Sequence, residues 1–217
     1  MIKDKDYLVE RLHDYSILLE TREIFLNPSD SDSETDIALA ITFIKNLRLL
    51  ESINKNNIII HQYNAGGQWQ SAFAIYDAIR DSDCHITIVG HGEVQSAGVL
   101  ILQAADCRLV MPHCEIMLHE GTSGIHSELS HKAAKSWSVI ERQKEELLYD
   151  IYTDKCVSGQ FFIDKLYKRN RIKAYLRTQM AKQEDWVISP SDALEYGLID
   201  DIIGSKKYPH LSSVLTV

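Results

Sequence analysis

Residues 84–105, CHITIVGHGEVQSAGVLILQAA, decide the fold that we expect for this chain. Residues 85–89 alternate as in a β-strand, and the apolar run over residues 97–105 is typical of a buried helix. The segment between them contains two glycines, Gly90 and Gly92, which predicts a tight turn. A strand that leads through a turn into a helix is the repeating unit of a parallel α/β sheet.

Ser96 stands where this turn meets the helix. The first N–H groups of a helix are unpaired and the helix dipole is positive there, so an anion can be stabilised at this point. One such anion is the oxyanion of an acyl-transfer intermediate. The alternative is that Ser96 only caps the helix. This stretch by itself leaves both interpretations open.

The same order of strand, loop and helix recurs along the chain, which predicts an α/β fold with right-handed parallel crossovers. Expected strands cover residues 22–26, 57–63, 84–90, 108–111, 115–119 and 199–203. Expected helices cover residues 35–53, 70–80, 128–152, 161–183 and the segment capped by Ser189. The helix over residues 128–152 is long enough to project towards a partner subunit, although a plain core helix fits its apolar periodicity equally well.

Composition places the chain among ordinary globular proteins. It has 217 residues, 45% of them hydrophobic and 25% charged, which suits one α/β domain. We expect a mobile segment over residues 1–17, a domain over residues 18–203 and a loose tail over residues 204–217. The net charge of −8 argues against nucleic-acid binding, and no apolar run is long enough to span a membrane.

The cysteines and the first residues indicate a cytoplasmic protein. The N-terminus is charged throughout, unlike a secretory signal. Cys84, Cys107, Cys114 and Cys156 lack CxxC spacing, so we expect reduced thiols. The histidines show no ligand spacing, and we expect neither a metal nor a cofactor.

Three polar features follow expected strands, where open α/β sheets bind ligands: the Gly66-Gly67 pair, Ser96 and His119. The glycine pair lacks the further residues of a dinucleotide or phosphate loop. Val94 stands where an α/β-hydrolase elbow needs glycine, which disfavours that fold.

His119 is either a hydrogen-bonded structural residue or the base for a serine nucleophile. A base of this kind needs a carboxylate to orient its ring. The candidates are Asp106, Glu120, Glu184 and Asp185, and their spacing does not choose among them.

Several motifs, in order from residue 18 to residue 203, resemble the ClpP family, the proteolytic subunit of the Clp protease. Residues 18–26 (LLETREIFL) resemble its early "LL-x-x-R-x-I-F-L" segment, and Gly66-Gly67 with residues 74–77 (AIYD) resemble its "S-P-G-G" loop and "IYD" helix. Residues 96–98 (SAG) resemble "A-S-M-G-A", and residues 116–119 (IMLH) resemble "V-M-I-H-Q-P". Residues 185–189 (DWVIS) and 195–200 (EYGLID) resemble "D-R-F-L-S" and "E-Y-G-L-V-D".

The resemblance implies a catalytic site. Ser96 would be the nucleophile, His119 the general base and Asp185 the orienting acid. The N–H groups of Gly67 and Ala97 would form the oxyanion hole. Substrate would bind as an added strand along residues 121–128, and the site residues assigned to it are Gly66, Gly121, Thr122 and Ser123.

The resemblance also implies an architecture and an activity. The fold would be ClpP/crotonase-like, with stacked β-β-α units and a projecting handle helix over residues 128–152. Handles would join two stacked rings, heptameric in the family, into a barrel of identical subunits. Such a barrel would be a serine endopeptidase that cleaves short peptides and unfolded polypeptides, fed by an AAA+ unfoldase of the Clp type.

Some positions depart from the family pattern. Asn64-Ala65 replaces Ser-Pro, which predicts a less rigid loop. Ala97 is smaller than the usual methionine and could widen the S1 pocket. Ile59 and His61 stand where the family has an aromatic pair that docks the ATPase, which puts that docking in doubt. Two rival functions are an inactive ring subunit or scaffold of the same fold, and a crotonase-like acyl-CoA enzyme.

Overall fold

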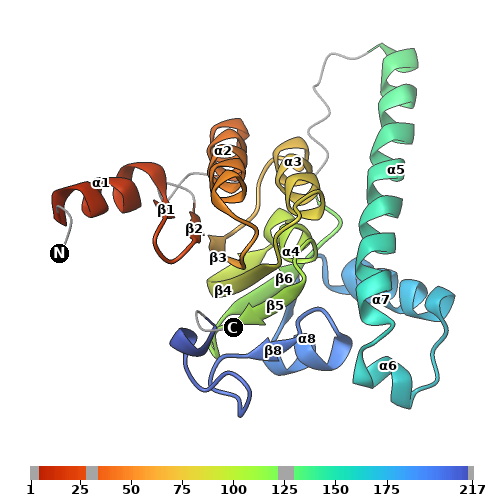
Figure 1. The fold of residues 1–217 in the computed structure, drawn as a ribbon. Helices are drawn as coiled ribbons and strands as arrows, with labels where there is room; N and C mark the ends of the chain where they lie inside the picture. Colours follow the sequence, from red (N-terminus) through yellow and green to blue (C-terminus); the bar gives the residue numbers. More distant parts are fainter. Residues whose placement is uncertain (1–4, 28–33, 122–129, 215–217) are drawn as a thin grey trace.

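The computed structural model describes residues 5–27, 34–121 and 130–214 (Figure 1). The helices are α1 (Lys5–Tyr15), α2 (Ile37–Ile53), α3 (Trp69–Arg80), α4 (Ala97–Leu102), α5 (His131–Cys156), α6 (Gln160–Asp164), α7 (Arg169–Gln183) and α8 (Pro190–Tyr196). The strands are β1 (Ile17–Leu18), β2 (Glu23–Leu26), β3 (Ile58–Asn64), β4 (Ile86–Gln95), β5 (Cys107–Val110), β6 (Glu115–Leu118), β7 (Trp186–Ile188) and β8 (Asp201–Ile202). A short 3₁₀ helix, η1, covers Leu211–Ser213.

The strands form one mixed sheet. The main path runs β1-β2-β3-β4-β5-β8, and every pair along it is parallel except β1 with β2. Strand β6 pairs in parallel with β4, and β7 pairs antiparallel with β6. The expected α/β fold with parallel crossovers is confirmed.

Strand β4 is longer than the sequence predicts. Residues 87–90 pair with β5, and residues 93–95 pair with β6. The tight turn expected over the segment that starts at Gly90 is wrong: Gly92 has a positive φ of 56°, but the strand continues beyond it to Gln95. The pairing that extends β4 comes from β6, about twenty residues later, so local periodicity could not reveal it.

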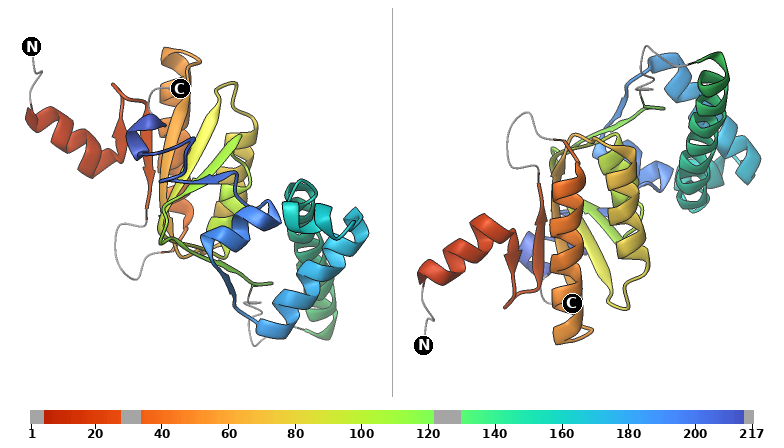
Figure 2. Two further views of the ribbon diagram at one scale, coloured as in Figure 1. Left: turned by 90° about the horizontal axis from the view of Figure 1, so that it is seen from below. Right: turned by 90° about the horizontal axis from the view of Figure 1, so that it is seen from above.

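Helices α2, α3 and α4 cover one face of the sheet (Figure 2). Strand β3 reads Ile-Ile-Ile because the sheet is covered on both faces. On the opposite face a smaller apolar cluster joins the strands to the C-terminal segment. Its buried members are Ile59, Val89, Leu109, Ile203, Tyr208 and Val214.

Both ends of the chain hold more structure than expected. Lys5–Tyr15 form a helix, and the segment after Gly204 packs Tyr208 and Val214 onto the sheet instead of lying loose. These two side chains are almost fully buried. The outer boundaries proposed for the domain stay predictions.

Helix α5 is a projecting helix, as expected (Figure 1). Ser130 caps it by accepting a hydrogen bond from the Ala133 N–H. All its buried residues lie between Leu148 and Cys156, while the apolar side chains of its first half are exposed. The alternative of a plain core helix therefore fails for that half.

Two helices occupy the region expected to be helical at residues 161–183. The break falls at Leu166, which has a positive φ of 55°. The last helix starts and ends at the residues that the sequence predicts: Ser189 caps its start, Pro190 follows, and Gly197 ends it with a φ of 78°. In the described part of the chain, no helix has the length and apolar character needed to cross a membrane.

Candidate active site

Ser96 joins the end of β4 to the start of α4. Its backbone combines a positive φ of 51° with a ψ of −120°, a conformation that non-glycine residues seldom adopt outside functional sites. Its side chain makes no capping hydrogen bond. The Ser96 Oγ instead lies 2.6 Å from the Nε2 of His119. Of the two interpretations of Ser96, the simple cap is therefore excluded.

The pairing of β4 with β6 sets this contact. Gln95 lies opposite Met117, and the Ser96 N–H donates to the Met117 carbonyl at 2.8 Å. His119 follows β6 directly, so the two strand ends carry the hydroxyl and the imidazole to the same edge of the sheet. This explains why residues 23 positions apart meet.

Asp185 reaches the other side of the His119 ring. Strand β7 pairs with β6 through Leu118 and Trp186, which places the residue before β7 beside the residue after β6. The Asp185 Oδ1 lies 3.3 Å from the His119 Nδ1. With the proton on Nδ1, the Nε2 is free to accept the Ser96 hydroxyl proton.

Of the four candidate carboxylates, Asp185 is the one that the structure brings to His119. Asp106 accepts a hydrogen bond from the Ile86 N–H at the far end of β4. Glu120 accepts one from the Tyr149 hydroxyl on α5. Burial and this carboxylate raise the pKa of Tyr149, so the phenol remains protonated and ties α5 to the strand that ends at His119.

Solvent reaches the outer end of this arrangement. The His119 side chain is 23% exposed and that of Asp185 is 68% exposed. An exposed pair at 3.3 Å gains little stability from its charge interaction. The geometry therefore serves to orient the imidazole more than to stabilise the fold.

The loop at Gly66 and Gly67 packs directly against Ser96. A Cβ on Gly66 would lie 2.7 Å from the Ser96 Cβ, and one on Gly67 would lie 2.4 Å from the Thr35 N. Both glycines have positive φ, at 109° and 143°. No residue with a side chain fits here without displacing backbone or the serine.

Two backbone donors remain available beside the serine. Ala97 is the first residue of α4, so its N–H has no acceptor within the helix. Within the described part of the chain, neither this N–H nor that of Gly67 donates a hydrogen bond. Both N–H groups are therefore without an acceptor among the described residues, which is what a donor to an oxyanion requires.

Part of the expected substrate strand falls outside the described residues. Thr122 and Ser123 lie in the range 122–129, of which nothing is described. Gly121 is exposed and has a φ of 87°. Its assignment, like those of the other site residues, stays a prediction.

Sequence reasoning missed the residues that hold the glycine loop. Asn64 and Thr35 are both fully buried and hydrogen-bonded to each other beneath it. Asn64 carried a signal, because Asn two residues before a glycine commonly forms a turn through its side chain. Thr35 carried none, because it meets the loop only through tertiary structure.

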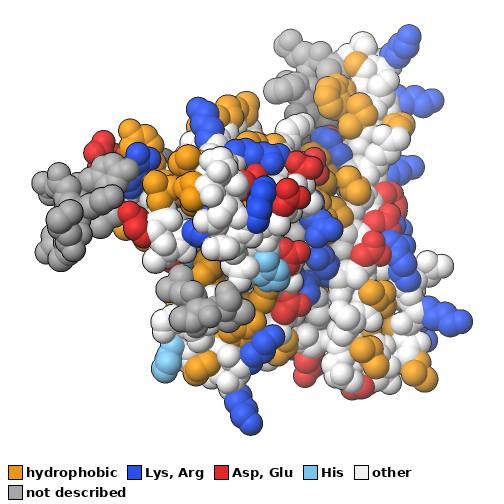
Figure 3. All heavy atoms as spheres, viewed as in Figure 1, with side chains coloured by type: hydrophobic (Ala, Val, Ile, Leu, Met, Phe, Trp, Pro, Cys, Tyr) orange, Lys and Arg blue, Asp and Glu red, His pale blue; other side chains and the backbone are white. Residues whose placement is uncertain are grey.

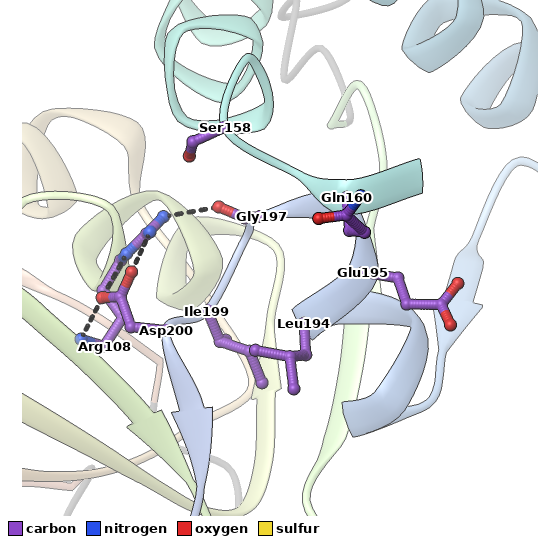
Figure 4. Close-up of a pocket in the computed structure, with 8 residues that line it drawn as sticks. All are labelled: Arg108, Ser158, Gln160, Leu194, Glu195, Gly197, Ile199 and Asp200. Carbon is purple, nitrogen blue, oxygen red and sulfur yellow. Dashed lines mark hydrogen bonds and ion pairs between the residues drawn. The ribbon is translucent and has the colours of Figure 1, made fainter. Parts of the chain in front are cut away.

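A separate cavity of about 390 Å³ lies between the start of α6, α8, Arg108 of β5 and the loop that joins α8 to β8 (Figure 4). Its buried cation, Arg108, is saturated by Asp200, Gln103 and the Gly197 carbonyl. Arg108 is therefore engaged within the protein and is not presented to an anionic ligand. Among the described residues, no group of three or more His, Cys, Asp or Glu is placed to hold a metal ion.

The order of Ser96, His119 and Asp185 is the order found in serine hydrolases, with a hydrogen bond between the first two and an ion pair between the last two. The sequence profile of the Clp protease family matches residues 8–206. The chain belongs to the Clp protease family, which confirms the resemblance seen in the sequence.

Curated relatives carry consistent names. The chain is 29% identical over 198 residues to the ATP-dependent Clp protease proteolytic subunit of Deinococcus radiodurans, covering 89% of this chain and 86% of the relative. It is 29% identical over 198 residues to the subunit of that name from Borreliella afzelii, covering 89% of each. The match to subunit 2 of Pseudomonas aeruginosa is 25% over 191 residues, covering 87% and 84%.

A solved structure supports the fold. A mutant of the ClpP1 protein from Listeria monocytogenes superposes with a TM-score of 0.70 at 21% identity, covering 88% of this chain and 96% of that one. The ClpP-like fold is thereby confirmed. At this level of identity the likeness concerns the fold alone.

Proposed function

We propose that this chain is a serine endopeptidase of the ClpP type, with Ser96 as nucleophile, His119 as base and Asp185 as the orienting acid. The observation that carries the proposal is the 2.6 Å contact between the Ser96 Oγ and the His119 Nε2. The Asp185 carboxylate at 3.3 Å from the Nδ1 and the strained serine backbone support it.

The reaction follows from these positions. The Ser96 Oγ attacks the scissile carbonyl carbon while the His119 Nε2 takes the hydroxyl proton. The N–H groups of Gly67 and Ala97 bind the oxyanion of the tetrahedral intermediate. Collapse of that intermediate breaks the C–N bond, and the imidazolium returns the proton to the leaving amine. Water, activated by the same ring, then hydrolyses the acyl-enzyme.

The proposed substrates are short peptides and unfolded polypeptides. An extended chain would lie beside Gly66 on one side and the segment that starts at Gly121 on the other, adding a strand through backbone hydrogen bonds. Recognition through the backbone accepts many sequences, which suits an endopeptidase of low specificity.

Helix α5 supports the proposed assembly into two stacked rings. Its projecting half exposes Trp137, Val139 and Ile140, each at least 39% accessible, and apolar side chains gather near its free end in Figure 3. Apolar surface of this kind marks an interface between proteins. Trp137→Glu should split a double ring into single rings in mass photometry. A wild-type protein that is monomeric at micromolar concentration would contradict the assembly.

The names of the relatives include "ATP-dependent", and for this chain we propose an ATPase partner of the Clp type that delivers unfolded substrate. Ile59 is 4% exposed because the C-terminal segment covers it, and His61 is bound by Glu23. Neither presents an aromatic ring to a partner. Degradation of a tagged folded protein with a generic bacterial Clp ATPase should therefore be inefficient, whereas short peptides should be cleaved without ATP.

A fluorophosphonate probe tests the catalytic proposal. The wild-type protein should be labelled on Ser96 and should cleave short peptides, and Ser96→Ala should do neither while keeping its fold. A folded wild-type assembly whose Ser96 stays unlabelled would instead favour the inactive subunit or scaffold. Turnover of an acyl-CoA that survives Ser96→Ala would favour the crotonase-like enzyme.

A further inference from the structure

A buried polar pair lies beneath the loop that carries Gly66 and Gly67. The pair consists of Asn64, the last residue of β3, and Thr35, which precedes α2, and neither is exposed. The Asn64 Oδ1 accepts two hydrogen bonds, from the Gly66 N–H at 2.7 Å and from the Thr35 hydroxyl at 3.0 Å. One side-chain oxygen thus joins the loop to a segment 29 residues earlier.

The backbone of Thr35 holds the same loop from the other side. Its N–H donates to the Gly66 carbonyl at 2.7 Å, and its carbonyl accepts from the Gln68 N–H at 2.8 Å. Thr35 and Gly67 form a parallel bridge, in which the residues on either side of Gly67 make the hydrogen bonds. The Gly67 N–H is consequently left to point away from Thr35.

Burying Asn64 lowers the stability of the fold, so packing alone does not explain why an asparagine stands here. Within the described residues the buried Asn64 Nδ2 has no hydrogen-bond partner. A buried amide without a partner is destabilising, and a smaller or apolar residue would avoid the penalty. What distinguishes asparagine at this site is an acceptor oxygen that reaches both Gly66 and Thr35.

We propose that Asn64 and Thr35 are positioning residues for the oxyanion hole, holding the Gly66–Gly67 loop so that the Gly67 N–H faces the reacting carbonyl. The inference rests on the proposed peptidase function. It also replaces the expectation that the loop, lacking proline, is less rigid: four hydrogen bonds hold it instead. When a donor is misplaced by a fraction of an ångström, the enzyme loses more affinity for the transition state than for the substrate.

Variants of the pair separate positioning from general destabilisation. Asn64→Ala removes both bonds to the Oδ1 and should lower kcat per labelled site by about 10- to 100-fold, with KM changed less than about twofold. Thr35→Val keeps the size and the backbone bonds but loses the hydroxyl, and should lower kcat less, by about 3- to 10-fold. The conservative Thr35→Ser restores the hydroxyl and should recover most of that loss.

Transition-state affinity gives a readout that a merely structural role would not move. A peptide aldehyde forms a tetrahedral adduct with Ser96 whose oxygen uses the same donors, so its affinity should fall in parallel with kcat/KM in Asn64→Ala. A structural role would lower the fraction of sites that can be labelled and leave each remaining site fully active. Wild-type kcat per site and wild-type aldehyde affinity in Asn64→Ala would overturn the proposal.

Hydrogen exchange tests the pair without relying on activity. In a Ser96→Ala background, adding Asn64→Ala should speed amide exchange across residues 66–68 and leave α7 unchanged. Unchanged exchange in the loop would also overturn the proposal. If the wild-type serine is never labelled, the peptidase function fails, while the exchange result still decides whether the pair holds the loop.

Discussion

Two rows of three polar side chains in this molecule are built alike and differ in their surroundings. The Ser96 row consists of Ser96, His119 and Asp185. The His61 row consists of His91, His61 and Glu23: the His61 Nδ1 lies 3.1 Å from the His91 Nε2, and its Nε2 lies 2.7 Å from the Glu23 Oε2. Each row places an imidazole between a carboxylate and a third polar group.

Burial separates the two rows. The His61 and Glu23 side chains are 7% and 11% exposed, and the Phe25 ring stacks on His61 at 4.8 Å. In a neutral His61 ring whose Nε2–H donates to the carboxylate, the Nδ1 is the acceptor for the Nε2–H of His91. This row satisfies buried polar groups on the sheet face that the C-terminal segment covers.

The comparison teaches that a carboxylate–histidine pair does not by itself make a catalytic site. The carboxylate–histidine contact is shorter and more buried in the His61 row than in the Ser96 row. The third group of the His61 row is another imidazole, however, and the described residues around it supply no nucleophile. The Ser96 row has a longer, wetter ion pair but a strained serine and two free backbone donors. What is needed for chemistry is the hydroxyl, the donors and access for a substrate.

Replacing each central histidine should produce opposite losses. His119→Gln should lower peptide cleavage at least about a thousandfold because the base is gone, with an unchanged melting temperature. His61→Gln should lower the melting temperature by several degrees and leave cleavage per labelled site within about threefold. Calorimetry and peptide hydrolysis on both variants check this. If His61→Gln abolishes cleavage in a folded protein, the two rows are not independent.

Asp185→Asn should have a smaller effect than loss of the base. The carboxamide favours the wrong tautomer of His119, which in a buried triad costs about ten thousandfold. Because Asp185 is mostly exposed and 3.3 Å away, we expect a loss of about a hundredfold, measured as kcat with saturating peptide. A loss of less than about threefold would assign the orienting role to another group.

Glu23→Gln should weaken stability alone. It replaces a buried charge-assisted hydrogen bond to His61 by a neutral one, and such bonds contribute about 1.5–3 kcal/mol. Urea unfolding should show a lower midpoint with an unchanged slope. The matched variant at an exposed carboxylate, Asp83→Asn, should leave the midpoint unaltered, since its ion pair with Lys55 is on the surface.

The smallest expected effect is a pH dependence of stability from His91. Burial, and then the neighbouring His61, lower the pKa of His91 below its ordinary value of 6.5. The unfolded chain therefore takes up a proton at a higher pH than the folded protein does, and stability falls as the pH drops below about 6.5. His91→Gln should flatten this part of the curve of unfolding free energy against pH. An identical slope in wild type and variant would contradict it.

Local sequence signals predicted most of the elements and singled out Ser96 and His119, whereas Asp185 came from the family resemblance. The glycine pair, the helix-start serine and the strand-end histidine were visible as separate features, and motif order joined them. Contacts made across the sheet could not be predicted from local sequence signals. The extension of β4 depends on β6, the choice of Asp185 on the pairing of β6 with β7, and the loop support on Thr35. The C-terminal segment looked loose because Tyr208 and Val214 are isolated apolar residues in a polar stretch.

The pairing of β4 with β6 determines whether the candidate active site forms at all. Side chains alternate along a strand, so a slip of one residue would turn His119 to the opposite side of the sheet from Ser96. A single inserted residue between Ile116 and Leu118 would thus erase the site without touching any of its members. For protein engineering, the hydrogen bonds between β4 and β6 are therefore the place where an insertion does the most harm to the site.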